Sequence, residues 1–273
     1  MVAEVITFHK MLSGCVRGEH RFWEFFVSTY GSLAEHLVKQ HFHNVSSRLP
    51  AISSELFNST SENDRAFFRE FSGSNERDFL IYFEQRVFGV TRRHSSGQES
   101  PSEFDFETLE RLFGKVPLAY QEVAWLAMNG YQEDPTNRIL RVPLALVQKA
   151  EEEVLKNWSE ILSRQMTAFP LVQDHLRQQV ESRKGVNCPA IKVFSDLMDG
   201  RIVWREKQQV ENHIAECLYC LDRETSLKET LFHIRLLEPL PTESVQGYLR
   251  QLNIHEGVPA RPSLLTKVFR VFK

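Results

Sequence analysis

Three side chains that can bind a metal ion lie within eight residues of one another. His213, Cys217 and Cys220 fall in the segment NHIAECLYCLDRE, residues 212–224. On a helix, residues four apart share a face, and a Cys-x-x-Cys spacing lets a chain that leaves a helix present two thiolates to one ion. Structural zinc has four such ligands in a closed tetrahedron. This spacing predicts three of the four.

Cys188 is the only other cysteine in the C-terminal half, 25 residues before His213. A predicted helical hairpin with the turn MDGR separates the two and can bring Cys188 back alongside. We therefore expect Cys188, His213, Cys217 and Cys220 to hold one Zn2+. The alternative is that Cys188 and Cys217 are small buried apolar side chains and that His213 is a surface histidine.

The composition is that of a soluble globular chain. It has 273 residues, 42% of them hydrophobic, a formal net charge of -3 and only four cysteines. So few cysteines do not form a disulfide framework, and in a reducing compartment a cluster favours metal binding. The sequence shows neither a signal peptide nor an apolar run long enough to span a membrane, so we expect a cytoplasmic protein. Cys15 is expected to be a buried or inert thiol.

Helical periodicity runs through the whole chain, and no alternating strand pattern occurs, so we predict an all-α fold. An apolar stripe over 11–38 indicates a helix interrupted at Gly31. Further helices are expected at 105–113, at 117–129 and from Leu144 to about Ala168, with a break at 130–137. The segment 44–62 has no clear pattern, and the histidines at 41 and 43 are expected on the surface.

A polar linker at 94–103 marks a domain boundary. We predict domains at 1–95, 104–168 and 186–236, with a helical extension at 237–273. The extension ends in an amphipathic, basic segment, SLLTKVFRVFK. Such a segment either docks on a protein surface, which we favour, or lies on a membrane.

Residues 188–223 read CPAIKVFSDLMDGRIVWREKQQVENHIAECLYCLDR. This block resembles the zinc-binding anti-sigma domain, in which a leading Cys and a helical hairpin precede His-x-x-x-Cys-x-x-Cys. The resemblance implies a helical zinc module that binds a sigma factor. In some members of the family, oxidation of a thiol releases that factor. For this chain we expect structural zinc in preference to redox sensing.

The N-terminal part resembles a sigma factor of the extracytoplasmic-function type. FWEFFVSTYGSLAEHLVKQ (22–40) and FREFSGSNERDFLIYFEQRVFGVTRR (68–93) are similar to the domain that binds core polymerase and melts the promoter. Residues 109–154 are similar to the second sigma domain, which ends in a helix-turn-helix. The resemblance implies that RNA polymerase core and promoter DNA are partners. Five basic residues are the candidate nucleic-acid contacts: Arg92, Arg93, Arg141, Lys149 and Lys156.

Several positions depart from the sigma pattern. Pro135 falls in the first helix of the helix-turn-helix, and Arg141 stands where the turn usually has Gly. The expected recognition helix, with two lysines and three glutamates over 144–158, has a net charge of -1, although affinity for DNA comes mainly from Lys and Arg. Residues 1–95 carry eleven basic and eleven acidic side chains. These features favour an alternative function, a sigma-derived module that binds a sigma factor or another protein and not DNA.

We expect no enzymatic activity. The sequence lacks a phosphate-binding Gly-rich loop, a Gly-x-Ser-x-Gly nucleophile motif and a His-Glu-x-x-His helix. A zinc ion with four protein ligands also leaves no open position for a substrate. The leading interpretation is a sigma-like transcription regulator in which the fused zinc module controls whether the sigma-like surfaces are available.

Overall fold

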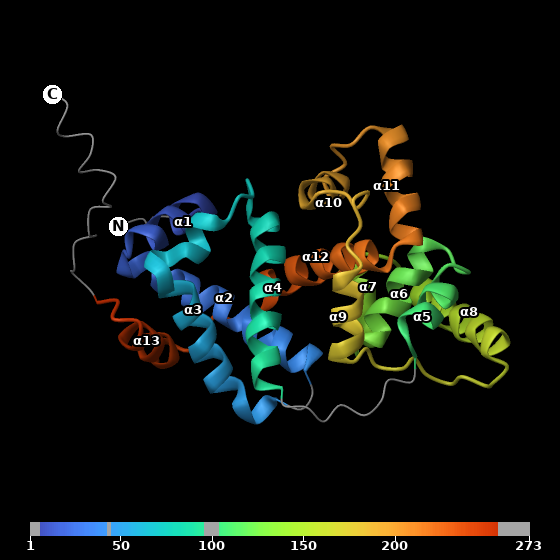
Figure 1. Cartoon of the computed structure of the whole chain (residues 1–273), viewed down its shortest axis with the longest axis horizontal. Helices are drawn as coiled ribbons and strands as arrows, with labels where there is room; N and C mark the ends of the chain where they lie inside the picture. Colours follow the sequence, from blue (N-terminus) through green and yellow to red (C-terminus); the bar gives the residue numbers. More distant parts are fainter. Residues whose placement is uncertain (1–5, 43–44, 96–103, 256–273) are drawn as a thin grey trace. The chain divides into compact units, whose positions relative to one another are not determined.

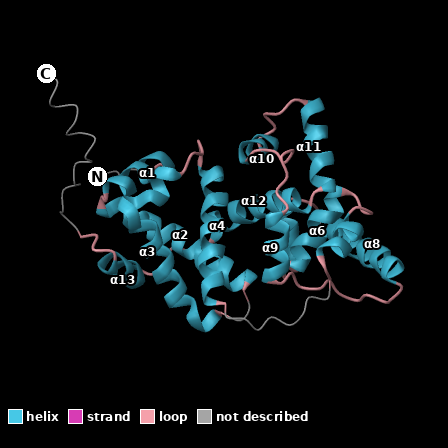
Figure 2. Ribbon diagram, viewed as in Figure 1, coloured by secondary structure: helices cyan, strands magenta, loops and turns pink. Residues whose placement is uncertain are grey.

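The computed structural model describes residues 6–42, 45–95 and 104–255, and over these residues the chain is helical with no strand (Figures 1 and 2). The all-α prediction is confirmed. Most of the linker at 94–103 and the amphipathic segment at 263–273 lie outside the described residues. The helices are α1 (Phe8–Arg17), α2 (His20–His41), the 3-10 helix η1 (Ser46–Arg48), α3 (Leu49–Glu70), α4 (Glu76–His94), α5 (Phe106–Phe113), α6 (Leu118–Met128), α7 (Glu133–Leu140), α8 (Leu144–Leu162), α9 (Asp174–Ser182), α10 (Ile191–Met198), α11 (Trp204–Glu216), α12 (Leu218–Leu236) and α13 (Thr242–Gln251).

The chain divides into two compact units. Unit 1 consists of residues 1–39, 44–94 and 233–273, and unit 2 of residues 40–43 and 95–232. The predicted second sigma-like domain and almost all of the predicted zinc module therefore fall in the same unit.

Unit 1 is built on an aromatic core. Phe26 makes edge-to-face contacts with Phe57, Phe68 and Phe83, at ring-centroid distances of 5.0 to 6.1 Å. Such arrangements place the positive edge of one ring on the negative face of the next, which adds to the gain from burial. The predicted buried thiol is confirmed: Cys15 is fully buried, and burial raises its pKa well above the ordinary value.

Gly31 does not interrupt the second helix, so that prediction is wrong. The helix α2 runs unbroken from His20 to His41. A Cβ at Gly31 would lie 2.5 Å from Leu240 Cδ1 and 3.0 Å from Phe57 Cζ. The missing side chain lets Leu240 approach the helix backbone closely, and this packing explains the glycine without a helix break.

Other helix boundaries also differ from the prediction. Within the segment at 44–62, for which no element was predicted, residues 46–62 form η1 and the first part of α3, a helix with a kink at Glu62–Arg65. Residues 133–137 of the break expected at 130–137 belong to α7. Pro135 is the third residue of this helix, and a backbone N–H at that position has no intrahelical acceptor, so proline loses no hydrogen bond there. The helix α8 ends at Leu162, and not near Ala168, because Ser163 adopts a left-handed conformation with φ 52°.

Candidate metal centre

Three consecutive helices of unit 2 position the four predicted metal ligands. Cys188 lies just before α10, where its backbone N–H donates to the carbonyl of Gly185 at 3.1 Å. His213 is in the last turn of α11. Cys217 is the residue between α11 and α12, with an extended backbone (φ -134°, ψ 104°), and Cys220 lies in the first turn of α12. The extended residue turns the chain off one helix so that both thiols of Cys-x-x-Cys face the same point.

The four ligand atoms form one cluster. All lie within 4.8 Å of one another; Cys188 Sγ is 3.9 Å from Cys217 Sγ, and His213 Nε2 is 3.2 Å from Cys220 Sγ. A tetrahedral ion with metal–sulfur bonds of about 2.3 Å places its ligand atoms about 3.8 Å apart. The cluster therefore fits around a single ion of this size, and these four residues could hold one metal ion.

Cys217 and Cys220 influence each other's ionisation, so that a thiolate is favoured at one position and disfavoured at the other. A hydrogen bond with Cys220 lowers the pKa of Cys217 to about 5, against the opposing effect of burial. The same hydrogen bond, together with burial and the negative charge of Cys217, raises the pKa of Cys220. A thiolate at one position thus disfavours a thiolate at the other, and a divalent cation between them removes this conflict. The backbone N–H of Gly185 also donates to Cys188 Sγ, at 3.2 Å.

The segment for which a helix-turn-helix is predicted lies in the same unit. The helices α6, α7 and α8 pack on one another, with Val123, Val147 and Ala150 fully buried between α6 and α8. The turn between α7 and α8 contains Arg141, an exposed residue with a left-handed backbone (φ 57°). The backbone N–H of Val142 donates to the carbonyl of Asn137 at 3.1 Å and stabilises this turn.

The helix α8, predicted as the recognition helix, presents charges of both signs to solvent. Lys149 and Lys156 are exposed, and Lys149 Nζ lies 3.5 Å from Glu153 Oε1. Burial and the negative charge of Glu133 raise the pKa of Glu151 on the same helix. Of the five candidate nucleic-acid contacts, Arg141, Lys149 and Lys156 are therefore exposed in unit 2.

The two remaining candidates, Arg92 and Arg93, end helix α4 in unit 1. Arg93 Nη2 lies 2.6 Å from Glu55 Oε1, and His94 contacts the second oxygen of the same carboxylate. Partial burial raises the pKa of Glu55, but the hydrogen bonds from Arg93 and His94 outweigh it and lower the pKa. The charge of Arg93 is thus partly neutralised within the unit.

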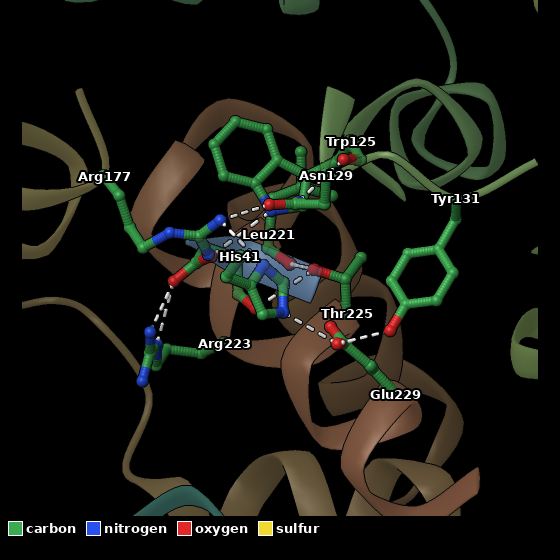
Figure 3. Close-up of polar contacts among 10 residues, drawn as sticks. His41, Trp125, Asn129, Tyr131, Arg177, Leu221, Arg223, Thr225 and Glu229 are labelled. Carbon is green, nitrogen blue, oxygen red and sulfur yellow. Dashed lines mark hydrogen bonds and ion pairs between the residues drawn. The ribbon is translucent and has the colours of Figure 1, made fainter. Parts of the chain in front are cut away.

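The structure also contains a buried polar network that the sequence analysis missed (Figure 3). His41 is buried, contrary to the prediction of a surface histidine, and its Nε2 lies 2.7 Å from Glu229 Oε1; His43 lies outside the described residues. Tyr131 donates its hydroxyl to the same Glu229 oxygen at 2.6 Å. Arg177 lies 3.0 Å from His41 Nδ1 and also donates to Asn129.

The network continues along α12 to a buried carboxylate. Asp222 is fully buried and lies between two guanidinium groups, with Arg223 Nε at 3.1 Å and Arg177 Nη1 at 3.7 Å. Trp125 Nε1 of α6 donates to Asp222 at 3.3 Å. Burial raises the pKa of Asp222, but the two arginines outweigh it, so the pKa stays below the ordinary value. No local sequence pattern joins these residues, which come from α2, α6, α9, α12 and the turn between α6 and α7.

No helix in the described part of the chain is long and apolar enough to cross a membrane. Comparisons with protein-family models, with curated proteins and with solved structures find no match.

Proposed function

We propose that this chain is a sigma-like transcription regulator in which a zinc module is permanently attached to the helix-turn-helix. The ligand set, three sulfur atoms and one imidazole nitrogen with no free position, is that of a structural zinc site. The proposal locates the protein in the cytoplasm, where it would meet RNA polymerase core and promoter DNA.

The observation that carries the proposal is the attachment of the metal-bearing helices to the helix-turn-helix. Gln121 of α6 donates its side-chain amide to the carbonyl of Ala215 on α11, at 3.0 Å. Lys228 of α12 lies 2.7 Å from Glu122 of α6. Trp125 bonds to Asp222 one helical turn further along α6. A buried polar group that loses its partner is strongly destabilised, so contacts of this kind oppose separation of the two parts. They therefore favour a permanent association over a reversible one.

A zinc module that stays attached would control the helix-turn-helix by holding it in one arrangement, and not by dissociating from it. A covalently attached partner has a high effective concentration, so it separates from its target far less readily than a free anti-sigma factor. The zinc module would then hold the helix-turn-helix in one arrangement, and metal binding would set whether that arrangement persists.

A second candidate function is protein binding without DNA binding. It is favoured by the surface of α8, where Glu151, Glu152 and Glu153 follow one another and the exposed Lys149 is paired with Glu153. Phosphates are repelled by such a surface, and counterion release requires unpaired cationic side chains. In this function, a sigma factor or another effector protein would be the partner.

One pair of binding measurements separates the candidates. Fluorescence anisotropy with a labelled duplex of mixed sequence at low salt tests DNA binding, and gel filtration with core polymerase tests the second partner. The sigma-like function predicts binding in both assays, with DNA affinity reduced in Lys149→Gln/Lys156→Gln. The matched control is Glu152→Gln/Glu153→Gln, which should not weaken DNA binding. Failure of the wild-type chain in both assays would contradict the first function and favour the second.

A further inference from the structure

A groove with a volume of about 630 Å³ lies on unit 2 beside the recognition helix. One wall is the stripe of α8 that contains Leu144, Glu151 and Leu155, and the opposite side is formed by the start of α7 and by residues 167–169. Leu144 is 40% exposed, an unusually open position for a large apolar side chain next to other apolar lining groups. These apolar lining residues are therefore suited to contact apolar side chains of a ligand.

The charged residues that line the groove are all acidic. Three carboxylates line it, from Glu133, Asp134 and Glu151, and no Lys, Arg or His is among its lining residues. Arg138 pairs with Asp134 from outside the groove, at 3.2 Å, and Gln148 donates to Glu133 at 2.7 Å. Neither contact neutralises Glu151, which is half-buried and faces the charge of Glu133. A cationic group placed between these two side chains would be stabilised by both.

We propose that this groove is a docking site for a basic, amphipathic helix of a partner protein. The apolar face of such a helix would cover Leu144, Leu155 and Phe169, while its Lys or Arg side chains reach the carboxylates of Glu133 and Glu151. This is the helix-in-groove mode of recognition, in which anchors three and four residues apart provide affinity and the charged lining residues provide specificity. Nucleic acid is excluded as the occupant, because its phosphates would face three carboxylates. The site is independent of whether the chain binds promoter DNA elsewhere.

The sequence itself supplies a probe with this chemistry. Residues 262–273, PSLLTKVFRVFK, combine three basic residues with four Leu or Phe residues and two valines, and contain no acidic residue. A fluorescein-labelled synthetic peptide of this sequence can be titrated with the full chain and followed by fluorescence anisotropy. A second peptide with the three basic residues changed to Glu is the negative control for the charge requirement.

Two double variants of the full chain locate the binding site. Glu133→Gln/Glu151→Gln removes two charges from the groove, and Glu152→Gln/Glu153→Gln removes the same number from the neighbouring exposed surface of α8. We expect the first to weaken peptide binding about tenfold and the second to leave it within about twofold, because only the local carboxylates contact the bound cations. Leu144→Ser should also weaken binding about tenfold. Circular dichroism of each variant checks that the helical content is retained.

Three results would overturn the proposal. One is a wild-type chain that takes up no peptide, including the case in which its own C-terminal residues already fill the groove. Another is equal weakening by both double variants, which would indicate a general charge effect. The third is equal binding of the acidic control peptide.

Discussion

The imidazole Nε2 of His41 lies 2.7 Å from the carboxylate of Glu229, a residue 188 positions further along the chain. Both side chains are buried, and Tyr131 donates to the same carboxylate oxygen. The pair therefore connects the end of α2 with the middle of α12 through groups that have no access to water. Removal of one member takes a hydrogen-bond partner from groups that stay buried, and a partly satisfied buried network is costly.

Glu229→Ala is expected to destabilise unit 2 by about 3–5 kcal/mol, because the hydroxyl of Tyr131 and the ring of His41 lose their acceptor while they remain buried. Tyr131→Phe, which deletes one donor and leaves the carboxylate its contact with His41, should cost about 1 kcal/mol. Urea denaturation followed by circular dichroism measures both. The control Glu160→Ala on the exposed face of α8 should stay within about 0.5 kcal/mol of the wild type. Equal midpoints for Glu229→Ala and the control would show that the network does not contribute to stability.

The second prediction concerns metal content. The purified chain should contain about one zinc ion per molecule, and Cys217→Ser should reduce this stoichiometry several-fold, because oxygen is a poorer zinc ligand here than a thiolate. Cys15→Ala is the matched control, since Cys15 is the one cysteine outside the cluster and should leave the content unchanged. Plasma emission spectrometry measures the metal. A wild-type chain without any metal after purification in zinc-containing medium would contradict the assignment.

Acid should release the metal ion by protonating its thiolate ligands, Cys220 first and Cys217 at lower pH. Because the pKa of Cys217 is about 5 and that of Cys220 is raised, metal binding near neutral pH must displace a proton from Cys220. Zinc affinity should therefore rise with pH in the neutral range, and it should fall more steeply below about pH 5, where Cys217 also takes up a proton. Isothermal titration calorimetry in two buffers with different ionisation enthalpies measures the number of protons released. Binding without proton release would show that both thiols are already ionised.

A third group, Glu122, predicts a pH-dependent stability near neutrality. Burial raises its pKa to about 7, against the attraction of Lys228 and with the added repulsion of Glu224. The folded state then retains a proton that the unfolded state has lost, so stability should fall as pH rises from about 4.5 to about 7 and stay level above it. The loss should be on the order of 1–3 kcal/mol. Glu122→Gln should flatten this dependence, whereas Glu160→Gln should preserve it, as measured by thermal unfolding across this pH range.

The turn between α7 and α8 offers a test of backbone strain. Arg141 has φ 57°, a conformation that costs a residue with a Cβ about 1 kcal/mol and costs glycine little. Arg141→Gly should therefore stabilise unit 2 by about 0.5–1 kcal/mol. Arg138→Gly, three residues earlier inside α7, should destabilise it by about 1 kcal/mol, because there glycine adds only entropy to the unfolded chain. Changes of the same sign in the two variants would contradict the assigned turn.

The candidate metal cluster could be predicted from the sequence because the information that specifies it is local. Ligand type and spacing around His213 and Cys217 restrict the geometry strongly, and Cys188 was the only remaining thiol nearby. The buried network could not be found in this way. A histidine at the end of α2 and a glutamate in α12 look like ordinary surface residues until the tertiary fold brings them together. Gly31 was misread for a related reason, since its role depends on Leu240, a contact distant in sequence.

The segment between Cys188 and Cys220 contains two helices with little apolar surface of their own. Only Phe194 is a buried apolar residue of α10, and only Val210 and Ile214 are buried apolar residues of α11. So small a core cannot offset the conformational entropy of ordering both helices, whereas an ion joining the two ends of the segment closes it into a loop, much as a disulfide does. If zinc occupies the cluster, the persistence of this hairpin should follow the chemical potential of free zinc in its surroundings more closely than it follows temperature.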